Sequence, residues 1–242
     1  MPAVMKTETG LVRKQNEDAA WFDENKGIFA VADGMGGHLA GEVASAMAIE
    51  KIRKMSEEEK TPSISALRRA ILEANQSILD RAYEHDECRG MGTTLSVLWR
   101  GDSNLYIAHV GDSRIYRLHG TVLEQVTRDH SLVEEMVRSG ILSRSEARVH
   151  PRRNIITRAL GTEGDNSPDL QVYTEDPADI WLLCSDGLTG MVEDELIRDT
   201  LIKCPDIHTA ADRLIEQALQ AGGHDNITLI LDCKEEEQWR RG

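Results

Sequence analysis

A glycine-rich stretch behind a short apolar run carries the residues best suited to chemistry. Residues 28–32 have the length and composition of a buried strand, and Asp33 follows them directly. Residues 34–38 then read Gly-Met-Gly-Gly-His. Glycines this dense allow a tight turn and a close approach of the backbone to a ligand. We therefore expect Asp33 at the end of a strand, in a place for a cation or a phosphate, with His38 as a neighbouring acid–base group.

Three further aspartates stand where other predicted strands meet a glycine or an asparagine. They are Asp112 after residues 104–110, Asp186 after residues 180–184, and Asp225 before residues 227–231. Each of them alone is compatible with an ordinary turn. Together with Asp33 they suggest one rim of a β-rich core that bears a cluster of acids.

Clustered carboxylates repel one another, so a group of this kind normally holds cations. An all-oxygen donor set with no cysteine and little histidine favours Mg²⁺ or Mn²⁺ over Zn²⁺. Two such ions about 4 Å apart can activate a water between them and clamp a phosphoryl group. A serine or threonine alkoxide is a poor leaving group, so His38 would serve as the acid that protonates it.

Residues 13–18 form a polar cluster, Arg-Lys-Gln-Asn-Glu-Asp, in front of a predicted strand at residues 19–22. A solvated loop would explain the cluster. As a site, however, the planar fork of Arg13 suits phosphate oxygens. Glu17 and Asp18 offer carboxylates to a hard cation or to its waters.

The charge balance argues against two classes of binding partner. The 242 residues include 42 acidic and 28 basic side chains, which gives a net charge of −14. This balance argues against non-specific binding to nucleic acid and to an anionic membrane.

No apolar run approaches the roughly 20 residues that a membrane-spanning helix needs, and the first ten residues lack the apolar core of a signal peptide.

No linker or low-complexity tract divides the chain, so we expect one domain over residues 1–233 and a charged tail over residues 234–242. The four cysteines are scattered without metal-binding spacing, which predicts reduced and mostly buried thiols in a cytoplasmic protein. We expect the protein to be a monomer.

Periodicity predicts the remaining elements. Helices are expected near residues 40–55 and 194–203, at residues 209–221, and from an N-cap at Thr61 to about residue 85. Residues 3–8, 93–99 and a hairpin over 114–126 are expected as strands. The polar stretch at 139–160 is a candidate flap over a site. His130 is open to two interpretations, a structural loop histidine or a catalyst.

These residues carry a resemblance to a known family. The motifs are Arg13-x-x-Asn16-Glu17-Asp18, Asp33-Gly34-x-Gly36-Gly37-His38, Gly92-Thr93-Thr94, Val110-Gly111-Asp112-Ser113-Arg114, Ser185-Asp186-Gly187 and Asp225-Asn226-Ile227-Thr228. In this order they resemble the series found in metal-dependent protein phosphatases of the 2C type. The stretch from His150-Pro151 to Leu160-Gly161 is similar to the bacterial branch. The resemblance covers about residues 7–232.

The resemblance implies an α+β fold with a central β-sandwich of two antiparallel sheets and helices on both outer faces. It implies hydrolysis of phosphoserine and phosphothreonine in proteins by a water activated at a binuclear Mn²⁺ or Mg²⁺ centre. It also implies a signalling role in which a bacterial Ser/Thr kinase, opposed by this enzyme, supplies the phosphorylated substrates.

By the same resemblance, each motif residue has a role. Asp33 would bridge two ions and Gly34 would bind one of them through its carbonyl. Asp186 and Asp225 would complete the shell of the second ion. Asp112 with Asp186 would hold a weaker third ion.

The remaining motif residues would act around the ions. Glu17 and Asp18 would act through waters of the ions. Arg13 would bind phosphate and His38 would be the general acid. Residues 132–160 would form the flap that shapes access to the site.

Two alternatives stay open at this point. A non-catalytic phosphoprotein-binding protein on the same fold would be expected to lack a metal aspartate. A cation-dependent hydrolase of small phosphate esters or of nucleic acid is the other alternative, and the net charge of −14 disfavours nucleic acid.

Overall fold

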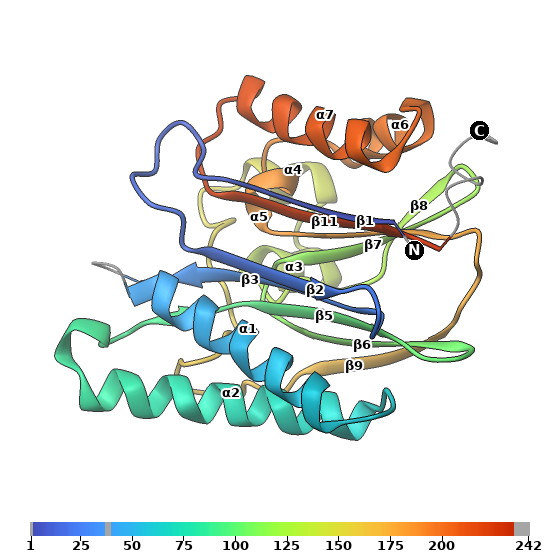
Figure 1. The fold of residues 1–242 in the computed structure, drawn as a ribbon. Helices are drawn as coiled ribbons and strands as arrows, with labels where there is room; N and C mark the ends of the chain where they lie inside the picture. The colour runs from blue at the N-terminus through green and yellow to red at the C-terminus, as the bar shows by residue number, and fades with distance from the viewer. Residues whose placement is uncertain (1, 37–39, 235–242) are drawn as a thin grey trace.

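The computed structural model describes residues 2–36 and 40–234 and arranges them as two antiparallel sheets between layers of helices (Figure 1). One sheet has the order β1-β11-β10-β7-β8. Its strands are β1 (Ala3–Glu8), β7 (Arg114–His119), β8 (Val122–Gln125), β10 (Ile180–Cys184) and β11 (Ile227–Cys233). Its strand pairs are antiparallel, and β1, near the N-terminus, lies beside β11, the last strand.

The second sheet has the order β2-β3-β5-β6-β9, with the short β4 paired to the end of β3. Its strands are β2 (Asp18–Asp23), β3 (Ile28–Met35), β4 (Gly92–Thr93), β5 (Leu95–Arg100), β6 (Asn104–Val110) and β9 (Asp169–Thr174). The prediction of a sandwich of two antiparallel sheets is confirmed.

Helices cover both outer faces of the sandwich. The long helices α1 (Ala40–Glu58) and α2 (Ile64–Glu84) lie against the second sheet, and α6 (Asp194–Lys203) and α7 (Ile207–Gln220) lie against the first (Figure 1). The shorter helices are a 3-10 turn at Asp86–Cys88, α3 (Leu132–Arg138), α4 (Arg144–Val149) and α5 (Asp186–Thr189).

The alternation of side chains along each strand builds three apolar layers. In β3, Ile28 and Ala30 face the helices α1 and α2, while Phe29 and Val31 face the other sheet. In β10, Trp181 packs between the sheets. Because both faces of the central strands are covered, these strands read as continuous apolar runs in the sequence.

Two boundaries differ from the sequence-based prediction. Thr61 does not cap α2, because the Ser63 hydroxyl accepts the Ala66 N–H at 3.2 Å and so makes Ser63 the N-cap. Asp33 does not end β3, which continues to Met35 because Gly34 and Met35 pair with β4.

Candidate metal centre and active site

Five aspartates converge on one rim of the sandwich, where strands of both sheets begin or end. They are Asp18 at the start of β2, Asp33 in β3, Asp112 between β6 and β7, Asp186 at the start of α5, and Asp225 just before β11. Burial, and then the charges of the four other aspartates, raise the pKa of the Asp33 carboxyl well above its usual range. The structure thus brings together carboxylates that are far apart in the sequence.

Asp18 and Asp33 are held by three segments. They are partners in the antiparallel β2–β3 ladder. The Ser185 hydroxyl donates to Asp18 Oδ2 at 2.8 Å. The Asp33 N–H donates to Thr94 Oγ1 at 2.9 Å, and the Asp33 carbonyl accepts the Thr94 N–H at 2.9 Å. Both backbones are therefore fixed before any ion binds.

Asp186 lies where β10 turns into α5, and this turn passes very close to the residue before β11. A Cβ atom at Gly187 would lie 1.9 Å from the Asn226 carbonyl oxygen, so only glycine fits there. The Ser185 hydroxyl also accepts the Thr228 N–H at 3.0 Å. This close approach sets Asp186 beside Asp225 at the rim.

Asn226 ties the N-terminal loop to the site. Its Oδ1 accepts the Glu17 N–H at 2.9 Å, and its Nδ2 donates to the carbonyls of Thr9 and Gln15 at 2.9 and 2.8 Å. Asn226 is 4% exposed. The buried amide of Asn226 therefore holds the loop that carries Arg13 close to Asp225.

The ionisation of the cluster indicates what it can bind. Burial, as the main cause, raises the pKa of Asp18 to about 7 and that of Asp186 to about 6. Burial, and then the charge of Asp186, raise the pKa of Asp112 well above its usual range. Among the described residues, Asp18 Oδ1 and Asp112 Oδ1 are buried oxygens that receive no hydrogen bond. These carboxylate oxygens are free to act as metal ligands, and a bound cation would favour the ionised form that burial disfavours. The cluster therefore fits hard divalent cations such as Mg²⁺ or Mn²⁺.

Arg13 lies at the open side of the cluster. Its Nη2 donates to Asp225 Oδ2 at 2.8 Å, and its side chain is half exposed. This hydrogen bond raises the pKa of Arg13, with further contributions from the charges of Asp225 and Glu17. A guanidinium has five N–H donors, so most of them remain able to meet an anion at the rim.

Glu17 and Gly34 lie against the start of α1. A Cβ atom at Gly34 would lie 2.2 Å from the Gly41 carbonyl oxygen and 2.4 Å from that of Glu17, which explains the glycine. The Ser45 hydroxyl donates to the Glu17 carbonyl at 2.6 Å. Burial raises the pKa of the Glu17 carboxyl. His38, the predicted general acid, lies outside the described residues.

A hollow of about 370 Å³ lies between the cluster and the predicted flap. Asp112 and Asp186 of the cluster line it, and so do Arg144, Arg148 and Arg153 of the flap. The flap contains α3 and α4, whose N-caps are Ser131 and Ser143. Arg148 pairs with Glu193 at 2.7 Å and Arg144 lies 3.8 Å from Glu134, so nearby acids neutralise part of the positive charge of the flap.

The residues that position the site are absent from the sequence-based prediction. No role follows from the sequence for Ser185, Thr94 or Asn226, although all three lie within the motifs given above. The signal that could have found Asn226 is its place next to Asp225, since a buried amide can bind several backbone groups at once.

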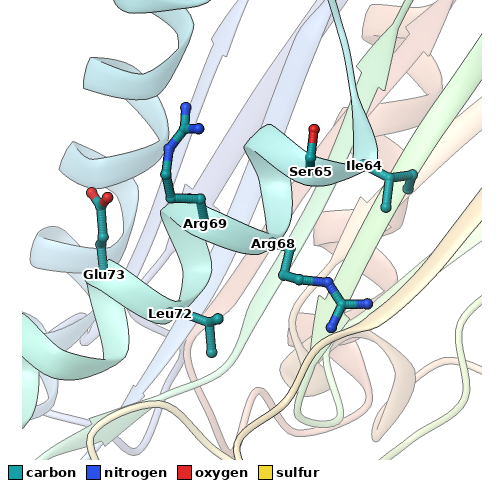
Figure 2. Close-up of a pocket in the computed structure, with 6 residues that line it drawn as sticks. All are labelled: Ile64, Ser65, Arg68, Arg69, Leu72 and Glu73. Atoms are coloured by element: carbon teal, nitrogen blue, oxygen red, sulfur yellow. The ribbon is translucent and has the colours of Figure 1, made fainter.

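Two other features do not belong to this site. A hollow of about 540 Å³ is lined by residues of α2 only. Figure 2 shows these side chains, which include Arg68, Leu72 and Glu73. In the part of the chain that the structure describes, His119, Asp176 and Asp179 bring ligand atoms within 4.8 Å of one another. Asp179 already accepts hydrogen bonds from Arg117 and His119, so this group is a structural ion-pair network.

Comparisons with known proteins agree with this geometry. The sequence profile of the family described as Protein phosphatase 2C matches residues 12–222. The serine/threonine phosphatase stp of Listeria welshimeri is 43% identical over 240 residues, which cover 96% of this chain and 95% of that protein.

Solved structures show the same fold. The crystal structure of the Mycobacterium tuberculosis serine/threonine phosphatase PstP/Ppp has a TM-score of 0.90 and 37% identity, and the match covers 97% of this chain and 99% of that one. A structure of the PstP catalytic domain in complex with two manganese ions has a TM-score of 0.87 and 35% identity, over 95% of this chain and 96% of that one. The extent of these matches, and the order of the motifs along the chain, show that this protein belongs to the protein phosphatase 2C family of bacterial serine/threonine phosphatases.

Proposed function

We propose that this chain removes phosphate from phosphoserine and phosphothreonine in proteins with the help of two Mn²⁺ or Mg²⁺ ions. The observation that carries the proposal is the meeting of five aspartates at one rim beside Arg13, with two buried oxygens, Asp18 Oδ1 and Asp112 Oδ1, that receive no hydrogen bond from the described residues. The manganese ions in the related PstP catalytic domain support the choice of metal.

The residues that would hold the ions follow from the cluster. Asp33, with the Gly34 carbonyl, Asp186 and Asp225 would bind the two ions, and Asp112 with Asp186 would bind a weaker third. Glu17 and Asp18 would contact their waters. When bound, such ions supply Lewis acidity and lower the pKa of a coordinated water.

The chain's own groups supply the rest. Arg13 would orient the phosphate through the guanidinium donors that Asp225 does not use. His38 would donate a proton to the departing serine or threonine oxygen. The flap of residues 132–160 would shape the access of the phosphorylated segment to the hollow beside Asp112 and Asp186.

Residues 1–233 would form one catalytic domain, and the enzyme would act as a cytoplasmic monomer in signalling. Since its substrate is a phosphorylated side chain, a Ser/Thr kinase must produce it. The net charge of −14 supports proteins over nucleic acid as substrates. Within the described residues, no helix has both the length and the apolar character needed to cross a membrane.

The test is phosphate release from a phosphothreonine peptide during a Mn²⁺ titration. We expect release to rise with Mn²⁺ and to vanish when a chelator is added. The matched control is Asp33→Asn, which keeps the size of the side chain but removes its charge. No release at any metal concentration from folded wild-type protein would overturn the proposal in favour of a binding protein.

A further inference from the structure

Two histidines lie side by side in the core next to the metal cluster. The rings of His109 and His130 are 4.9 Å apart between centroids, and their residues are 1% and 4% exposed. The roles proposed above use neither of them. Burial, as the largest cause, lowers the pKa of both imidazoles, so both are neutral near pH 7.

His130 binds both backbone groups of one residue, Gly111. The His130 N–H donates to the Gly111 carbonyl at 2.7 Å. The Gly111 N–H donates to His130 Nδ1 at 3.0 Å. Because Nδ1 accepts this hydrogen bond, the proton of the neutral ring is on Nε2, which lies 3.3 Å from Asp169 Oδ2. Asp169 in turn accepts a hydrogen bond from Arg158 at 3.0 Å.

Gly111 is the residue before Asp112, and its conformation sets the direction of that aspartate. Gly111 has a φ of +111°, and a Cβ atom there would lie 2.5 Å from Thr94 Cβ. Its backbone therefore adopts a shape that only glycine tolerates, and His130 holds this shape through its two hydrogen bonds. The Asp112 carboxylate lies near Asp186 and lines the hollow beneath the flap.

His130 also stands at the base of the flap. Its carbonyl accepts the Thr157 N–H at 2.7 Å, and Ser131 forms an isolated bridge with Ile156. The segment that leaves the core at His130 thus returns to the same residue. One side chain and its backbone connect the flap with the turn that carries Asp112.

We propose that His130 is a positioning residue that fixes the Gly111–Asp112 turn for binding of the third ion, and that it joins this turn to the flap. The inference rests on the role of Asp112 in the proposed function. His130 acts through Gly111 and does not touch substrate or metal. A histidine with a merely structural role would affect stability without changing the weakest metal-binding step.

The experiment compares Mn²⁺ binding by calorimetry in His130→Asn, His130→Gln and His130→Leu. Asparagine can place an amide oxygen near the position of Nδ1 and accept the Gly111 N–H, whereas glutamine places its amide one bond further out and leucine accepts nothing. We expect the weakest Mn²⁺ site to lose about 10-fold in affinity or more in the Gln and Leu variants and to be retained in Asn, the size of effect typical for residues behind metal ligands. If the Leu variant does not fold, the Asn and Gln pair decides.

Two controls complete the test. His109→Asn alters the neighbouring ring, which binds Ser96 and the Arg128 carbonyl and not Gly111, and it should leave Mn²⁺ binding unchanged. Asp112→Asn should reproduce the loss seen in His130→Gln, and the double variant should lose no more than either alone.

Three results would overturn the inference. The first is wild-type Mn²⁺ binding in folded His130→Gln, and the second is an equal loss in the Asn and Gln variants. The third is wild-type Mn²⁺ binding in Asp112→Asn, which would remove the third-ion role on which the inference depends. Because the readout is metal binding, these results are independent of whether the protein releases phosphate from the threonine peptide.

Discussion

Asp18 lies directly opposite Asp33 in the β2–β3 ladder, so two carboxylates occupy neighbouring positions on adjacent strands. Like charges in this position destabilise a sheet unless something neutralises them. Ser185 donates one hydrogen bond to Asp18, which relieves only part of the repulsion. The pair therefore destabilises the metal-free fold at any pH where both groups are ionised, and the cation that the site is proposed to bind would relieve the repulsion.

Asp33→Asn separates the catalytic and the structural consequences of this pair. We expect the variant to lose phosphatase activity, because the proposed bridging ligand is gone, and to melt at a higher temperature than wild type in the presence of chelator. Millimolar Mn²⁺ should raise the melting temperature of wild type and should raise that of the variant much less. A variant with wild-type turnover would contradict the assignment of Asp33.

In the metal-free protein, the contribution of Asp18 and Asp186 to stability should fall as the pH rises from about 4 to about 7. The pKa of Asp18 is raised to about 7 and that of Asp186 to about 6, mainly by burial. Between the ordinary pKa of an aspartate, about 3.9, and these values, the folded state binds more protons than the unfolded state, so the free energy of unfolding falls with rising pH.

His109 acts in the opposite direction, because burial lowers its pKa to about 4. The aspartate contribution is therefore measured as the difference between wild type and Asp18→Asn in urea unfolding at several pH values with chelator. We expect the variant to gain stability over wild type as the pH rises through this range. A constant difference across the range would contradict the raised pKa of Asp18.

Arg13→Ala should lower kcat/KM for a phosphothreonine peptide by about 10- to 100-fold, the range expected when a charge-assisted hydrogen bond worth about 1.5 to 3 kcal/mol is lost. Arg13→Lys should recover part of the loss, since an ammonium keeps the charge but not the planar fork. Arg53→Ala is the matched control, because Arg53 pairs with Glu50 and Glu57 on the surface of α1. If Arg13 served only to neutralise Asp225, Mn²⁺ affinity would change and KM would not.

His38→Ala should slow phosphate esters with poor leaving groups more than esters with good ones. General acid catalysis typically contributes about 10²- to 10⁴-fold, and an aryl phosphate needs little of it because its phenolate leaves readily. The measurement compares kcat for a phosphothreonine peptide and for an aryl phosphate in both proteins. Equal losses on the two substrates would exclude His38 as the acid.

Asn226→Ala should destabilise the protein by about 2 to 4 kcal/mol, because three backbone groups lose their buried partner. Asn226→Asp should also be destabilising, since a carboxylate oxygen would face the two carbonyls that now accept from Nδ2. The control is Asn25→Ala at an exposed turn. Urea unfolding in the presence of chelator measures the effect, and an Asn226→Ala protein as stable as wild type would show that water replaces the amide.

The sequence predicts much of the fold because local signals and tertiary contacts agree in it. The strands at residues 28–32 and 180–184 are buried on both faces and therefore read as apolar runs, and the acid that follows each run marks the rim. The predicted N-cap of α2, Thr61, is wrong, because Thr61-Pro62 and Ser63 offer competing start signals within three residues.

The positioning of the site could not be predicted in the same way. The hydrogen bond between Glu17 and Asn226 joins residues that are 209 positions apart in the sequence. The hydrogen bond between Asp18 and Ser185 joins residues that are 167 positions apart. Such contacts arise from the packing of two sheets and leave no periodic pattern in the sequence. His130 is a similar case. Its proposed positioning role depends on a hydrogen bond from the backbone of Gly111, which the neighbouring residue types do not predict.

The order of synthesis determines when the hydrogen bonds of Asn226 can form. The loop that carries Arg13 leaves the ribosome early, but Thr9, Gln15 and Glu17 find their shared partner only after residue 226 has been synthesised. Asp225 arrives at the same moment. A nascent chain therefore cannot assemble the complete rim. We expect the growing polypeptide to have no phosphatase activity until its last strand is in place.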